Sequence, residues 1–203
     1  IPMVILTPFS HGITKRIANE DLSSFDYIFC WLGNTDLLVS IIKLIEDKMN
    51  LEHDVSEVGV QIILLVEDGI RFYSSILPNL YKFVLKQSQE FSTEALNAHQ
   101  RTLRMRGRPK IVLARTYNEA IGIYEKYKNN ILGVITDVRF PRVERGEKDA
   151  LAGIKLCAAI RKEDPFVPLI IQSSESENVS YAAKYDAAFI DKNSKKMDVD
   201  LRR

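Results

Sequence analysis

Short apolar runs recur along this chain, and each of them ends at a polar or charged residue. Four of these runs occupy residues 60–66, 131–136, 167–172 and 187–191, and stretches with helical spacing separate them. Short runs of Val, Ile and Leu that alternate with helical segments are typical of a parallel sheet that is buried on both faces. The pattern therefore predicts an α/β fold with helices on either side of the sheet.

The residues at the ends of these runs carry the candidate chemistry. Glu67 and Asp68 follow the first run, Asp137 the second, Ser173 the third and Lys192 the fourth. Functional sites of parallel sheets lie beyond the carboxyl ends of the strands, so we expect these side chains to converge. Clustered carboxylates repel one another and are stable together mainly as oxygen ligands of a hard cation. An added ammonium and hydroxyl suit a phosphoryl group.

We interpret Asp137 as the phosphoacceptor, because a carboxylate can attack phosphorus and become an acyl phosphate. Asp68 and Asp137 are expected to bind Mg²⁺ or Mn²⁺ directly, and Glu67 is expected to reach the ion through a water molecule. Lys192 would neutralise charge on the phosphoryl group, and Ser173 would donate a hydrogen bond to it. Each residue alone is a weak signal, and their joint occurrence at four strand ends favours a phosphoryl-transfer site.

Taken with their neighbours, these positions resemble the response-regulator receiver domain over about residues 59–203. The matching segments are 64–68, 136–141 with Gly153, 168–174 and 189–192. The resemblance implies a flavodoxin-like (βα)5 fold with a parallel sheet of order 2-1-3-4-5, a further strand at 111–114 and a last helix cut short at Arg203. It also implies that the backbone carbonyl of Arg139 binds the metal and that Phe189 is a switch residue.

Three features depart from the family pattern. The segment 142–152 is longer than the usual link between the family's proline and glycine, and Asn193 stands where the family normally has proline. Arg139 is a bulky cation beside Asp137, where it can slow or bias an attacking water molecule. The lifetime of the phosphoryl group therefore does not follow from the motifs.

Residues 1–58 resemble the C-terminal half of a second, degenerate receiver. The run 2–7 parallels 168–173, the run 26–32 parallels 186–192, and helical spacing predicts a helix from Thr35 to Met49. Leu32 occupies the lysine position, which predicts a module that is not phosphorylated. An open apolar strand edge needs a cover. Upstream residues or a second copy of the chain can supply it, and we favour a homodimer through residues 1–58.

Composition restricts the partners and the location. The 203 residues are 46% hydrophobic with a net charge of +1, which argues against a dominant attraction to nucleic acid or membranes. No apolar run approaches the roughly 18 residues that span a membrane. Cys30 and Cys157 lie in apolar contexts and are expected to be reduced core thiols, which favours a cytoplasmic location. Residues 106–110 copy an AT-hook, but they precede the strand 111–114 and are interpreted as a turn.

We therefore expect a signalling module in a phosphorelay. A histidine kinase, a phosphotransfer protein or a small phosphodonor would phosphorylate Asp137 and thereby switch an output domain beyond Arg203. The chain would be a fragment of a multidomain protein, and it would not be an enzyme apart from self-dephosphorylation.

Two alternatives stay open. The first is a receiver that is not phosphorylated and serves as an interaction platform, for example for a fused enzyme such as a phosphoenolpyruvate synthase-like module. The second is an aspartyl-phosphate hydrolase of the haloacid-dehalogenase type. That type has a second aspartate two residues after the nucleophile, where this chain has Arg139. The second alternative is disfavoured because arginine does not relay protons near neutral pH.

Overall fold

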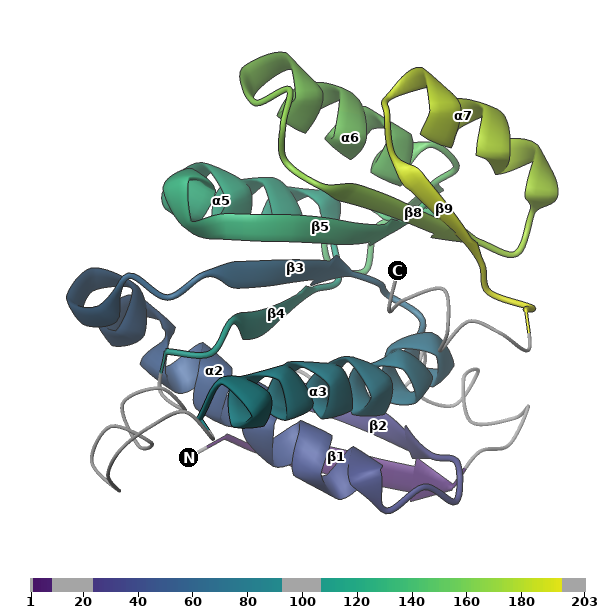
Figure 1. The fold of residues 1–203 in the computed structure, drawn as a ribbon. Helices are drawn as coiled ribbons and strands as arrows, with labels where there is room; N and C mark the ends of the chain where they lie inside the picture. Colours follow the sequence, from purple (N-terminus) through teal and green to yellow (C-terminus); the bar gives the residue numbers. More distant parts are fainter. Residues whose placement is uncertain (1, 9–23, 93–106, 195–203) are drawn as a thin grey trace.

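The computed structural model describes residues 2–8, 24–92 and 107–194 (Figure 1). Its main sheet consists of parallel strands in the order β4-β3-β5-β8-β9. The strands are β3 (Ile62–Val66), β4 (Lys110–Ala114), β5 (Ile131–Asp137), β8 (Leu169–Ser173) and β9 (Ala188–Asp191). Numbered along the chain within this sheet, the order is 2-1-3-4-5, which confirms the predicted flavodoxin-like arrangement.

Helices cover both faces of this sheet (Figure 1). One face carries α5 (Tyr117–Tyr127), α6 (Ala152–Glu163) and α7 (Val179–Lys184), and the other carries α3 (Ile70–Ser92) and α2 (Asp36–Val58). Short 3-10 turns, η1 (Lys128–Asn130) and η2 (Ser176–Asn178), precede β5 and α7. Successive side chains of a strand point to opposite faces. Leu64 accordingly lies in the core beside α5 and α6, and Leu65 in the core beside α3.

The front of the chain forms a second, smaller sheet. Strands β1 (Val4–Pro8) and β2 (Tyr27–Trp31) pair in parallel. Helix α2 follows them, and the Asn34 side chain accepts a hydrogen bond from the Asp36 amide at 2.9 Å where the helix begins. The helix extends to Val58 instead of ending at Met49 as predicted, and Gly59 terminates it in the left-handed conformation, with φ 68°.

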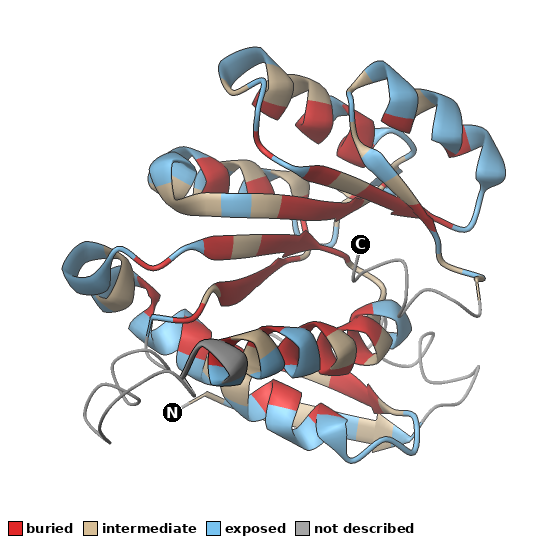
Figure 2. Cartoon of the chain, in the orientation of Figure 1, coloured by how far each residue is buried: buried red, intermediate tan, exposed pale blue. Residues whose placement is uncertain are grey.

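The front segment shares a core with the main sheet, and Figure 2 shows the buried residues on the facing sides of these elements. Phe29 of β2 and Leu37 of α2 belong to the same buried cluster as Leu65 of β3. The Tyr73 hydroxyl of α3 donates to the Ile28 carbonyl. The packing therefore joins the segments on both sides of residue 58. Three predictions stay untested: a domain boundary at residue 58, the interpretation of residues 1–58 as half a receiver, and the homodimer.

The long segment after β5 forms a hairpin that the sequence did not predict. Strands β6 (Phe140–Pro141) and β7 (Lys148–Asp149) pair antiparallel. The Gly146 amide donates to the Val143 carbonyl at 3.0 Å within the connecting turn. The hairpin follows β5 directly, so it begins at the edge of the sheet where the predicted site lies.

Three further predictions concern individual segments. Cys30 and Cys157 are buried free thiols, as expected. Arg108 is only 5% exposed and pairs with Asp47, which confirms that residues 107–110 are a turn leading into β4. No helix in the described ranges is long and apolar enough to cross a membrane. Residues 195–203, which would contain most of the predicted last helix, lie outside the described part of the chain.

Candidate functional site

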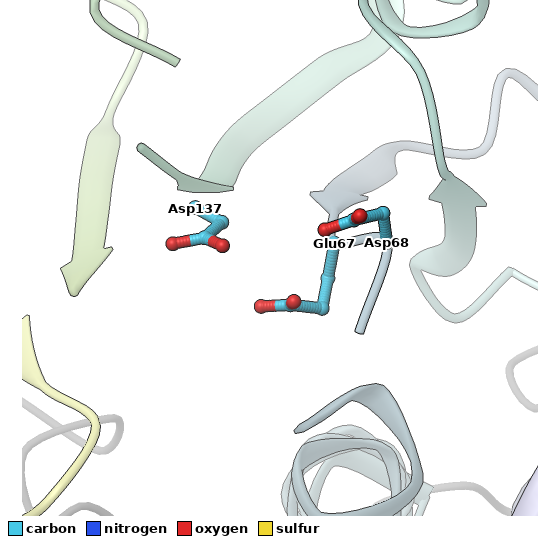
Figure 3. A group of neighbouring side chains, drawn as sticks. All are labelled: Glu67, Asp68 and Asp137. Atoms are coloured by element: carbon cyan, nitrogen blue, oxygen red, sulfur yellow. The ribbon is translucent and has the colours of Figure 1, made fainter. Parts of the chain in front are cut away.

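Three carboxylates meet at the carboxyl ends of β3 and β5 (Figure 3). Glu67 and Asp68 follow β3, and Asp137 is the last residue of β5. One oxygen from each of the three side chains lies within 4.8 Å of the others. Strands β3 and β5 are parallel neighbours with Val66 opposite Thr136, so the residues that follow are held side by side. The sheet thus brings together residues that are 70 positions apart.

Lys192 extends from the end of β9 into this cluster. Its Nζ lies 2.5 Å from Glu67 Oε2 and 3.0 Å from Asp137 Oδ1. The side chain is 4% exposed, and its Nζ lies 4.3 Å from the centre of the Phe72 ring, which is a favourable cation–π distance. Because one ammonium contacts two carboxylates, it offsets part of their mutual repulsion.

Glu67 is the most deeply buried member of the cluster. Its Oε1 accepts a hydrogen bond from the Gly69 amide at 3.0 Å, and its Oε2 accepts one from Gln172 Nε2 at 3.2 Å. Burial raises the pKa of Glu67 to about 7, while Lys192 lowers it and Asp137 raises it further. Gln172 was not predicted as a site residue. Its sequence signal is a polar residue inside an otherwise apolar strand.

Asp68 supplies the observation that tests the fit of a metal ion. Its Oδ2 lies 2.6 Å from Nζ of Lys148, a residue of the unpredicted hairpin. Its Oδ1 is buried and has no hydrogen-bond partner among the residues that the structure describes. A buried oxygen without a partner is costly, and a bound cation would satisfy it. Three carboxylates with such an oxygen fit the oxygen-rich coordination that Mg²⁺ and Mn²⁺ prefer.

Backbone contacts hold Asp137 in place. Its Oδ1 accepts a hydrogen bond from the Val138 amide at 2.8 Å, and its carbonyl oxygen accepts one from Thr136 Oγ1 at 2.8 Å. Gly153 lies close by in the first turn of α6, where an added Cβ would lie 1.9 Å from the Asp137 carbonyl oxygen. Glycine is therefore required here to let the helix approach the strand.

The remaining predicted residues lie around the cluster. Ser173 is buried at the end of β8, and its Oγ accepts hydrogen bonds from the Asn178 side chain at 2.9 Å and the Glu175 amide at 3.1 Å. Phe189 of β9 is half-buried and packs against the core beside α5 and α6. The Arg139 side chain is exposed. The roles of these three residues stay predictions.

Comparisons with known proteins complete the description. No family model matches the chain, and none of the curated proteins matches its sequence. Among solved structures, a response regulator receiver domain protein from Clostridium thermocellum is similar, with 21% identity and a TM-score of 0.44. The match covers 70% of this chain and 90% of that one. The chain has a flavodoxin-like fold. The order of its own strands carries this assignment, and no residue role is taken from the solved structure.

Proposed function

We propose that the chain is a receiver module that accepts a phosphoryl group on Asp137 and thereby switches a partner or an attached output domain. The supporting observation is the acidic cluster with its ammonium, in which Lys192 Nζ lies 3.0 Å from Asp137 Oδ1. Phosphoryl transfer depends on positioning and on positive charge at the phosphoryl oxygens. Lys192 supplies one such charge beside the acceptor.

In this proposal Asp137 attacks the phosphorus of a phosphohistidine or of a small acyl phosphate, and the bond to the donor breaks as the new P–O bond forms. Asp68, Asp137 and the Arg139 carbonyl would hold the cation, Mg²⁺ or Mn²⁺, and Glu67 would reach it through a water molecule. The bound cation would supply positive charge beside the phosphoryl group. Lys192 binds a phosphoryl oxygen. Ser173 Oγ already accepts two hydrogen bonds, so its O–H would donate to a phosphoryl oxygen.

The site is linked directly to the surface made by β8, β9 and α7. Ser173 pairs with Asp191 across β8 and β9, and the Lys192 amide donates to the Ser173 carbonyl at 2.9 Å. A shift of Ser173 or Lys192 toward a phosphoryl group would therefore move the ends of both strands. Phe189 lies on β9 between this edge and the core. A histidine kinase or phosphotransfer protein, and an output domain beyond Arg203, are the proposed partners.

The test is phosphorylation by acetyl phosphate in the presence of Mg²⁺, followed by intact-protein mass spectrometry. We expect the mass increase of one phosphoryl group in the natural chain and none in Asp137→Asn, because an amide is not a nucleophilic anion. Asp191→Asn is the matched control, since Asp191 is an exposed carboxylate at the end of β9, another strand of the same sheet. Modification that persists in Asp137→Asn would contradict the proposal, and a chain that is never modified would favour the interaction platform.

The homodimer belongs to the same proposal. Between Asp36 and Met49, helix α2 exposes four large apolar side chains: Leu38, Val39, Ile42 and Met49, at 45, 47, 56 and 68%. Ile42→Glu would place a charge among them, and Lys43→Gln next to it, which changes the net charge by the same amount, is the control for charge alone. We expect sedimentation to show a dimer that Ile42→Glu dissociates. A natural chain that stays monomeric at all concentrations would exclude the dimer.

A further inference from the structure

The hairpin β6–β7 brings a second lysine to the acidic cluster. Lys148 Nζ lies 2.6 Å from Asp68 Oδ2, and the two side chains are 49 and 14% exposed. The contact therefore joins a solvent-facing ammonium to a largely buried carboxylate. Lys148 stands in a charged segment that the sequence places in a connecting loop, and none of the expected roles in the site uses it.

Contacts on both sides fix the hairpin over the site. Before the turn, the Arg142 carbonyl accepts a hydrogen bond from the Asn118 amide of α5 at 3.1 Å. After the turn, Asp149 Oδ2 pairs with Lys155 Nζ of α6 at 2.6 Å. Lys148 is adjacent to Asp149, so its position relative to Asp68 is set by an anchored strand. The fold itself therefore positions Lys148 beside Asp68.

The charges of the cluster show what this contact does. Glu67, Asp68 and Asp137 contribute three negative charges when ionised, and Lys192 contributes one positive charge. Lys148 adds a second positive charge, so that the remaining charge is minus one instead of minus two. It also occupies one oxygen of Asp68, while the other oxygen is buried and without a partner. The ammonium thus lies on the residue that is expected to bind the cation directly.

We propose that Lys148 competes with the divalent cation for Asp68. Its ammonium neutralises Asp68 when no metal ion is bound and thereby weakens the binding of Mg²⁺. This inference rests on the proposed metal site. Like charges held several ångströms apart at a partly exposed site repel enough to change an affinity by about tenfold. The hairpin would therefore set the Mg²⁺ concentration at which Asp137 becomes competent for phosphoryl transfer.

The test is a calorimetric titration of the full chain with Mg²⁺, compared between variants. Lys148→Gln removes the charge and is expected to bind Mg²⁺ about tenfold more tightly than the natural chain. Lys148→Arg keeps the charge and is expected to bind with the natural affinity. Lys128→Gln is the matched control, because Lys128 is similarly exposed, at 57%, and pairs with Glu163, so that neither residue belongs to the hairpin or to its anchors. Its affinity is expected to change by less than about twofold.

The outcomes separate this inference from the metal site itself. Asp68→Ala should abolish binding if the metal site is correct. If Asp68→Ala does not bind Mg²⁺ and Lys148→Gln binds it no more tightly than the natural chain, the metal site stands and the competition by Lys148 is refuted. Lys148 would then only orient Asp68. An equal gain in Lys148→Gln and Lys128→Gln would also overturn it, since a general effect of removing one positive charge would then explain both. No binding by either the natural chain or Lys148→Gln would overturn both proposals.

Discussion

Replacement of Asp47 by alanine is expected to be among the most destabilising single changes on helix α2. The Asp47 side chain is fully buried and accepts four hydrogen bonds. Arg108 donates two of them, at 2.6 and 3.0 Å, and the Tyr81 hydroxyl and the Ile111 amide donate the others, each at 3.0 Å. This one carboxylate therefore connects α2, α3 and the beginning of β4.

The magnitude follows from what alanine would leave behind. Arg108 is 5% exposed, so Asp47→Ala leaves a buried guanidinium without its counter-charge. Breaking a buried ion pair in this way costs about 3–5 kcal/mol. The unsatisfied Ile111 amide contributes to the same loss and is not added separately. Asp47→Asn keeps one oxygen acceptor but loses the charge and puts an NH₂ donor where the second oxygen accepted, so it is expected to cost about 2 kcal/mol.

Urea unfolding monitored by circular dichroism measures these losses. Glu46→Ala is the matched control, because Glu46 is the adjacent acidic residue of α2 and pairs only with exposed Lys43, at 2.7 Å. Its effect should stay within about 0.5 kcal/mol. The double variant Asp47→Leu, Arg108→Met replaces the pair by apolar groups and should recover most of the loss. Asp47→Ala that matches Glu46→Ala in stability would refute the reasoning.

Three further predictions concern the main sheet. Gly153→Ala should destabilise the fold by about 2–3 kcal/mol in the same urea assay, because the new Cβ would lie 1.9 Å from the Asp137 carbonyl oxygen. Arg161→Lys should cost about 2 kcal/mol, since the guanidinium donates to the carbonyls of residues 164, 165, 167, 185 and 186 and an ammonium does not span them. Burial raises the pKa of Glu67 from 4.5 to about 7, so without a metal ion the natural chain should lose stability as the pH rises through that window. Relative to Glu67→Gln, the loss should be about 3 kcal/mol, and parallel pH profiles of the two chains would contradict it.

The main sheet was predictable because its strands are buried on both faces and appear as continuous apolar runs. The run 60–66 became β3 and the run 131–136 became β5, with boundaries within two residues. The acidic cluster was predictable for a related reason. Parallel strands place their carboxyl ends at one edge, so residues that follow different strands meet there without any sequence signal of contact.

The end of α2 was not predictable, because a charged residue interrupts its apolar face. Leu44 and Leu51 are both buried, and Asp47 lies between them at helical spacing with full burial. A carboxylate at that position normally indicates a solvent-facing side of a helix. Its burial depends on Arg108, a residue 61 positions later, and no local pattern reveals that partner. The apolar spacing on which the prediction rests is therefore interrupted after Ile45, and the helix predicted to end at Met49 extends to Val58.

The shared core changes what the division at residue 58 means for experiments. Removing residues 1–58 would take away Asp47 and Asp54, the counter-charges of Arg108 and Lys110 at the start of β4. It would also uncover the α3 side chains that pack against β2, including Tyr73. A chain that begins after Val58 is thus expected to be unstable, and point changes on α2 are the better way to study the front segment.

The hairpin shows that a segment longer than in the receiver pattern can add a charged residue, Lys148, to the candidate site. The segment 142–152 was recognised as long, and its charged residues are of the kind usually assigned to a solvated loop. However, a segment that leaves the carboxyl end of β5 begins at the edge where the site lies. Of its charged side chains, Lys148 faces Asp68, while Asp149 turns to Lys155. Insertions after an acceptor strand should therefore be searched for site residues, because their position in the sheet places them there before any motif does.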